Sequence, residues 1–98
     1  IMLRDRGGHV VWGTNTWHTK QVLQTLRAGE KISFDVRFRC DLGVGSFSFS
    51  TALTRGETHI DGNYEWQDNV IVFDVVNFDR SIFIGTSSLD ARIDIGRA

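Results

Sequence analysis

Apolar and polar residues alternate most regularly in the middle of the chain. From Ile32 to Cys40 every second residue is apolar, and polar or charged residues lie between them. The pattern resumes after a glycine-rich turn, with Phe47, Phe49 and Leu53 on one side and serines on the other. A period of two is typical of a half-buried strand. The two runs therefore predict adjacent antiparallel strands, with Cys40 as a buried small hydrophobe.

Shorter β patterns flank this central region. Residues 1–12 alternate around the turn signal Asp5-Arg6-Gly7-Gly8, which predicts a hairpin. Residues 17–29 carry some apolar residues at helical spacing and predict a short helical turn within a crossing loop. Residues 69–77 are apolar on both faces, which is typical of a strand that is central or covered by another chain. Residues 89–95 alternate again and predict a final strand.

Several short strands separated by glycine turns predict an all-β fold, an antiparallel β-sandwich of the immunoglobulin-like or jelly-roll type. The 98 residues allow one domain. Hydrophobic residues make up 41% and charged residues 23%, which predicts a globular core. A long polar loop is expected from Thr54 to Asp68. The inward-facing aromatic residues of the expected strands are Phe34, Phe38, Phe49 and Phe73.

The charge balance argues against some partners. Eleven basic and 12 acidic residues give a net charge of −1, which offers no electrostatic footprint for nucleic acid or an anionic membrane. The single cysteine, Cys40, allows no intrachain disulfide and favours a reducing compartment. The longest strongly apolar run, from Val70 to Phe73, is far too short for a membrane span. We therefore expect no nucleic-acid partner.

Catalytic and cofactor signatures are weak. The three histidines are scattered and Cys40 has no ligand-spaced companion, so neither a metal nor another cofactor is predicted. Calcium in the acidic loop around residues 57–68 is left open, although no EF-hand pattern occurs. The chain has neither a nucleophile elbow nor an ATP-binding P-loop motif. Twelve acids always supply some carboxylate pair, so the presence of one decides nothing, and a sandwich-type glycosidase is the least favoured of three function classes. We expect a binding domain and not an enzyme.

The most informative run is Tyr64-Glu65-Trp66-Gln67-Asp68-Asn69, which leads directly into a β-rich apolar strand. Three further blocks accompany it: residues 1–16 ending in Gly-Thr-Asn-Thr, residues 34–53, and Phe83-Ile84-Gly85 with Leu89. Together they resemble the C-terminal domain of the ATP-binding subunit of bacterial O-antigen polysaccharide ABC transporters, the Wzt type. We expect residues 1–98 to be a single carbohydrate-binding domain that lacks the family's first strand or strands and its ATPase domain.

The resemblance implies a function. In this family the domain holds the lipid-linked glycan that the transporter exports, so it implies a non-catalytic domain that recognises an O-antigen polysaccharide. It also implies a homodimer, because the ATP-binding subunits are paired, and the strand at residues 89–95 could pair or exchange between two chains. The parent protein would contact the membrane subunit of the transporter, in the cytoplasm and peripheral to the bacterial inner membrane. The alternative is a β-sandwich interaction or dimerisation domain without glycan binding.

Family members export chemically different glycans, so we expect sugar contacts mainly outside the shared motif. Asn15, Trp66, Asp68 and Asn69 of the motif should hold loop and strand ends. Aromatic rings can stack on a sugar face, and planar polar groups can bind its hydroxyls. The site is expected on the polar face of the strand at 30–40, with serines of the next strand beside it and residues 64–66 as a wall. The candidate contacts are Asp35, Arg37, Arg39, Ser48, Ser50, Trp17, His18, His59, Tyr64 and Trp66.

Each candidate also has a commoner structural role. A single tryptophan is more often partly buried with its N–H satisfied than part of a binding site. The charged residues between Asp35 and Arg39 more often form a solvated strand face with cross-strand charge pairs. A site somewhere among the candidates is thus better supported than any one of its members.

Overall fold

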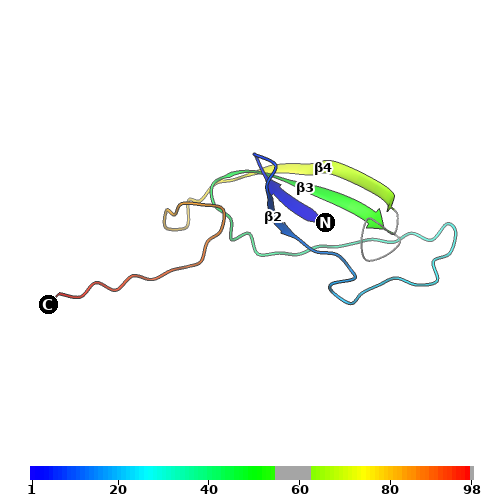
Figure 1. Cartoon of the computed structure of the whole chain (residues 1–98), viewed down its shortest axis with the longest axis horizontal. Coiled ribbons are helices and arrows are strands. Elements are labelled where there is room, and N and C mark those ends of the chain that lie inside the picture. Colours follow the sequence, from blue (N-terminus) through cyan, green and yellow to red (C-terminus); the bar gives the residue numbers. More distant parts are fainter. Residues whose placement is uncertain (55–62, 98) are drawn as a thin grey trace.

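The computed structural model describes residues 1–54 and 63–97 and forms one antiparallel sheet (Figure 1). Its strands are β1 (Met2–Asp5), β2 (Val10–Gly13), β3 (Gly45–Thr54) and β4 (Asn63–Val75), in the order β2-β1-β3-β4. The described residues contain no helix, and so none that could cross a membrane. The all-β prediction is confirmed. The second sheet that a sandwich requires is not formed by the described residues.

The predicted hairpin is confirmed. The turn between β1 and β2 begins at Asp5. The Asp5 carbonyl accepts a hydrogen bond from the Gly8 N–H at 3.0 Å, and the Asp5 carboxylate accepts one from the His9 N–H at 2.8 Å. Gly8 has a φ of 84°, a region that glycine enters at no steric cost. The His9 backbone N–H holds the pKa of Asp5 below its usual value, since that bond favours the charged carboxylate.

The core lies on one face of the central strands. Phe47 and Phe49 of β3 are 3% and 8% exposed, and Phe73 of β4 stacks against both, with ring centroids 5.8 and 5.6 Å apart. The strand predicted around the two β3 residues is therefore confirmed, as is their inward direction. Among the described residues, the buried hydrophobic set is Leu3, Leu42, Phe47, Phe49 and Val75.

The predicted strand at residues 30–40 is wrong. β1 and β4 occupy the two edges of β3, so no edge is left for this segment to pair with β3. The segment lies on the core side instead, where the Phe38 ring meets the Phe49 ring edge-on at 5.4 Å. Phe34 is 53% exposed and Phe38 45% exposed, which contradicts their predicted burial. Cys40, predicted as a buried hydrophobe, is also exposed.

β4 corrects two further predictions. It begins at Asn63, so residues 63–68 belong to a strand and not to a loop, whereas residues 55–62 lie outside the described residues. β4 is also an edge strand of the four-stranded sheet, so its predicted central position is wrong, while the alternative, cover by another chain, stays a prediction. Phe49 pairs with Ile71 and Thr51 with Gln67, so three residues of β4 face one residue of β3. This is a β-bulge, and Asn69 within it has a φ of 52°.

The chain between β2 and β3 contains one capped turn. Asn15 accepts a hydrogen bond from the His18 N–H at 2.7 Å through its side chain, as an N-cap does. Lys20 has a φ of 60°, and its N–H and that of Gln21 bond back into the turn, the pattern of a Schellman motif. The helical turn predicted for residues 17–29 thus begins earlier in the chain, after Asn15, and is shorter. It is short because the C-terminal cap at Lys20 follows the N-cap at Asn15 by five residues.

The end of the described chain leaves the sheet. Ser87 bridges to Leu42, and the Ser88 N–H donates to the Asp41 carbonyl at 2.8 Å. Residues 89–95, predicted as a final strand, form none and extend away from the body (Figure 1). Their apolar side chains are exposed to solvent, with Ile93 85% and Ile95 89% exposed.

Candidate functional site

A hollow of about 350 Å³ lies at one end of the sheet. The start of β1, both ends of β2 with the turn that follows it, β3 and Trp66 of β4 all contribute to its wall. Ser50 follows the core residue Phe49 in β3, so its side chain leaves the face opposite the aromatic core. Besides Trp66, the lining residues with polar side chains are Thr14, Asn15, His18, Ser50 and Thr51.

The capped turn brings two of these residues to the wall. The Thr14 N–H donates to the Ile1 carbonyl at 3.1 Å, which ties the chain after β2 to the start of β1. Asn15 then caps the turn by accepting from the His18 N–H. Because the cap fixes the backbone from Asn15 to His18, both residues are held at the rim of the hollow by local sequence.

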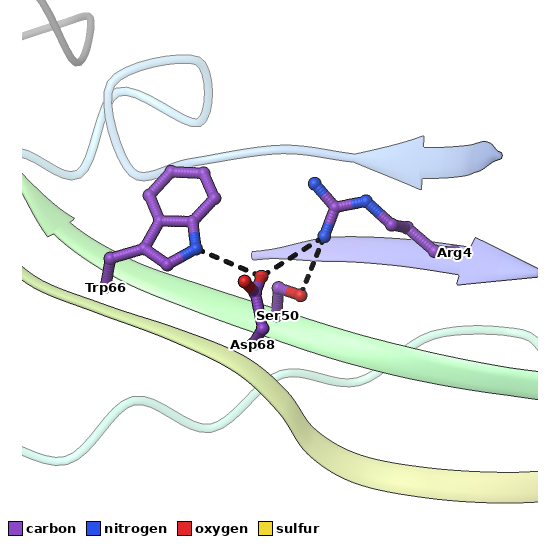
Figure 2. Close-up of polar contacts among 4 residues, drawn as sticks. All are labelled: Arg4, Ser50, Trp66 and Asp68. Carbon is purple, nitrogen blue, oxygen red and sulfur yellow. Dashed lines mark hydrogen bonds and ion pairs between the residues drawn. The ribbon is translucent and has the colours of Figure 1, made fainter. Parts of the chain in front are cut away.

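Four side chains from three strands meet beside the hollow (Figure 2). The Trp66 Nε1–H donates to Asp68 Oδ1 at 3.0 Å. Arg4 of β1 donates through Nη1 to Ser50 Oγ at 2.9 Å and reaches the same Asp68 oxygen at 3.4 Å. We call these four residues the Asp68 network. It spans β1, β3 and β4 on one face of the sheet.

The bulge in β4 explains why Asp68 can take part. Asp68 is the first of the three β4 residues that face Ser50. An extra residue in one strand bends it and re-aims its side chains. The Trp66 N–H lowers the pKa of Asp68, with hydrogen bonding to Ser50 and the charge of Arg4 acting in the same direction. The carboxylate is therefore charged at neutral pH and faces a cation.

Three predicted site residues come together at the hollow: His18, Ser50 and Trp66. They come from the capped turn, β3 and β4, far apart in the sequence. Ser48 lies on the same face of β3 as Ser50 and pairs with Arg4 of β1. Trp17 is next to His18 but lines a separate shallow hollow with Lys20.

Asp35, Arg37 and Arg39 are not brought to this hollow. They lie in the segment whose Phe38 contacts the core face, while the serines project from the opposite face. Arg39 forms an ion pair with Asp41 at 3.2 Å. His59 lies outside the described residues, and Tyr64 belongs to β4. The arrangement expected from alternation, with arginines and serines on one continuous polar face, is not present.

Arg4 belongs to the first motif block but is not among the residues predicted for the site. Two signals could have drawn attention to the network. Trp66 and Asp68 are two residues apart, the spacing that puts side chains on one face of a strand. Asn69 follows a polar pair inside an otherwise regular β pattern and is a residue type that tolerates a left-handed backbone, which is typical of a bulge. The expected structural role of Asn15 and Asp68 is confirmed by their hydrogen bonds.

Metal ligands do not gather in the part of the chain that the structure describes. No three His, Cys, Asp or Glu side chains there are grouped as a metal site requires. Glu57 and Asp61, two of the acids considered for calcium, lie outside the described residues. Asp68, a third, faces Arg4.

Comparison with known proteins identifies the family. No curated protein matches the chain. A family model described as the Wzt C-terminal domain matches residues 1–89, which confirms the resemblance carried by the sequence motifs. This family is a non-catalytic C-terminal domain, and it implies a role in O-antigen ABC transport. The chain, with its antiparallel sheet and the hollow beside Trp66, belongs to the Wzt C-terminal domain family.

Proposed function

We propose that this domain holds a lipid-linked O-antigen polysaccharide in the hollow beside Trp66 during export by an ABC transporter. The observation that carries the proposal is the meeting of His18, Ser50 and Trp66 at one hollow. Each was a candidate on chemical grounds, and they come from separate parts of the chain. Family membership supplies the transport context.

The hollow suits a sugar in size and chemistry. Ligand pockets span roughly 300–1,000 Å³, so a volume of about 350 Å³ fits a short part of a glycan chain. Trp66 is 41% exposed, which leaves part of its ring open to the C–H face of a sugar. The lining residues Thr14, Asn15 and His18 carry polar groups that can donate to or accept from sugar hydroxyls.

Titration with O-polysaccharides of defined structure tests the proposal. Calorimetry would give the affinity, and NMR would show which residues shift. Trp66→Ala should weaken binding about tenfold through the loss of ring stacking. Trp12→Ala is the matched control, because Trp12 is 39% exposed and does not line the hollow. Equal losses for the two variants, or no binding by the unmodified chain to its cognate polysaccharide, would refute the proposal.

The sequence-based placement on Asp35, Arg37 and Arg39 is a separate prediction that the same titration tests. Replacing Arg37 or Arg39 by alanine should leave affinity within about twofold if the hollow is the site, because both arginines project from a segment on the other side of the sheet. A loss of about 1–3 kcal/mol in binding for these variants, with normal binding by Trp66→Ala, would move the site to the arginine segment.

We further propose that the domain acts as a homodimer and meets the transporter's membrane subunit through its parent protein, in the cytoplasm at the bacterial inner membrane. The support for pairing is the exposure of apolar side chains on separate segments, such as Phe34, Ile93 and Ile95, which a second copy could cover. The same exposure favours the alternative function, a dimerisation domain without glycan binding. A dimer that shifts no resonance with any cognate polysaccharide would select that alternative.

A further inference from the structure

Trp66 depends on a neighbour for its orientation. Its indole N–H points to Asp68 Oδ1 at 3.0 Å, within the usual range of a hydrogen bond (Figure 2). Because the terminal torsion of a tryptophan side chain has a broad profile, a half-exposed ring needs an added contact to select one orientation. A charged acceptor supplies a stronger contact than a neutral one.

Asp68 is itself held from across the sheet. Arg4 approaches the same carboxylate oxygen at 3.4 Å and donates to Ser50 Oγ at 2.9 Å. Ser50 is 3% exposed, so this end of the network is anchored in a buried position. The Arg4 side chain is 27% exposed against 58% for Asp68, so the cation is the more sheltered partner. The carboxylate is thus fixed between a buried anchor and the indole that it orients.

We propose that Asp68 is a positioning residue, which holds the Trp66 ring in the orientation that forms the wall of the hollow. This rests on the proposed function, in which the ring face contacts a sugar. Asp68 does not itself line the hollow, so its effect on a ligand passes through Trp66. The bulge at residues 68–70 is the backbone feature that makes this contact possible.

Asp68→Ala removes the acceptor, whereas Asp68→Asn keeps an oxygen that can still accept from the indole N–H. Asp68→Ala should therefore weaken binding of the cognate O-polysaccharide about five- to tenfold, and Asp68→Asn should recover affinity to within about twofold. Asp74→Ala is the matched control, since Asp74 lies on the same strand and bonds Ser46, away from the hollow. It should leave affinity unchanged.

Two readouts separate positioning from general destabilisation. The indole N–H resonance of Trp66, assigned by its loss in Trp66→Phe, should move in Asp68→Ala and stay near its place in Asp74→Ala. In a double-mutant cycle, Asp68→Ala should lower affinity by less than about twofold when it is added to Trp66→Phe, because the N–H that it acts through is already gone. Melting temperatures of all variants show whether the fold is intact.

The proposal is overturned if Asp68→Ala leaves the indole resonance in place, or if it weakens binding equally with and without Trp66→Phe. Should Asp68→Ala fail to fold, Asp68→Ser takes its place, because a hydroxyl on a shorter side chain cannot span the distance to the indole. If the unmodified chain binds no polysaccharide, the proposed function fails, whereas the indole resonance still decides whether Asp68 positions Trp66.

Discussion

At the scale of single residues, the partners of Asp68 include two of different kinds, beside Ser50. The indole of Trp66 is neutral and the guanidinium of Arg4 is charged, yet both share one carboxylate oxygen. Both contacts favour the ionised form of the acid, which is why the pKa of Asp68 lies below its usual value. A single proton on this carboxylate would therefore weaken two contacts at once.

This predicts a titration of Trp66 at low pH. Asp68 has a lowered pKa in the folded chain, so the contact is complete above the ordinary value of 3.8 and is lost as the pH falls through the lower folded value. The indole N–H resonance of Trp66 should shift with a midpoint below 3.8. Asp68→Asn should abolish the shift. A midpoint at or above 3.8 would show that these partners do not stabilise the charged form of the carboxylate.

Two phenylalanines should differ in their effect on stability. Phe47 is 3% exposed and stacks on Phe73, so Phe47→Ala should cost about 3–5 kcal/mol of unfolding free energy. Phe34 is 53% exposed, so Phe34→Ala should cost about 1–2 kcal/mol in the single chain, because less of its surface leaves water on folding. Urea denaturation measures both. Equal losses of unfolding free energy for the two variants would mean that Phe34 is buried, in contradiction to its exposure in the single chain.

At the scale of elements, strand pairing determines which patterns could be read from sequence. The hairpin at residues 1–13 and the strand at 45–54 were predictable, since local turns and alternation specify them. The segment at 30–40 alternates just as regularly. Alternation shows which side chains share a face, but it does not show which strand, if any, the segment pairs with. Both edges of β3 are already taken, one by β1 and the other by β4. The polar residues 63–68 at the start of β4 were predicted as a loop, because hydrogen bonding between strand backbones does not depend on hydrophobic side chains.

The candidate site was also only partly predictable, because the sequence shows residue chemistry but not which strands pair. Residue chemistry identified Trp66, Ser50 and His18, and the structure brings them to one hollow. Their neighbours could not be found from chemistry alone, because the bulge and the β1–β3 register decide that Arg4 reaches Asp68. Asp35, Arg37 and Arg39 do not join this hollow, because their segment lies on the other side of the sheet, and their part in binding stays a prediction.

The bulge in β4 gives a prediction at this scale. Asn69 has a φ of 52°, where a β-branched side chain collides with the backbone. Asn69→Val should destabilise the fold by about 1–2 kcal/mol, whereas Asn69→Gly should be close to neutral, since glycine adopts this conformation readily. Urea denaturation compares them. A comparable cost for both variants would mean that the asparagine side chain, and not its backbone angle, matters.

At the scale of the whole molecule, the chain is extended for its length. Its radius of gyration is 18.1 Å, against about 13 Å for a compact domain of this size. Residues 89–97, which project from the body, contribute to the difference (Figure 1). An apolar segment that alternates like a strand but pairs with nothing among the described residues is a surface that association would bury.

The last prediction is a dimer that depends on this segment. The apolar side chains of residues 89–95 share one side of an alternating pattern, so they can pack together on a second copy. Equilibrium sedimentation should show a two-chain species at micromolar concentration. Ile93→Asp should shift it to monomer, because Ile93 is 85% exposed in the single chain and would be buried in the pair. Arg92→Asp, on the alternate side, is the control and should stay dimeric. A monomeric mass for the unmodified chain would rule the pairing out, and equal effects of the two variants would place the interface elsewhere.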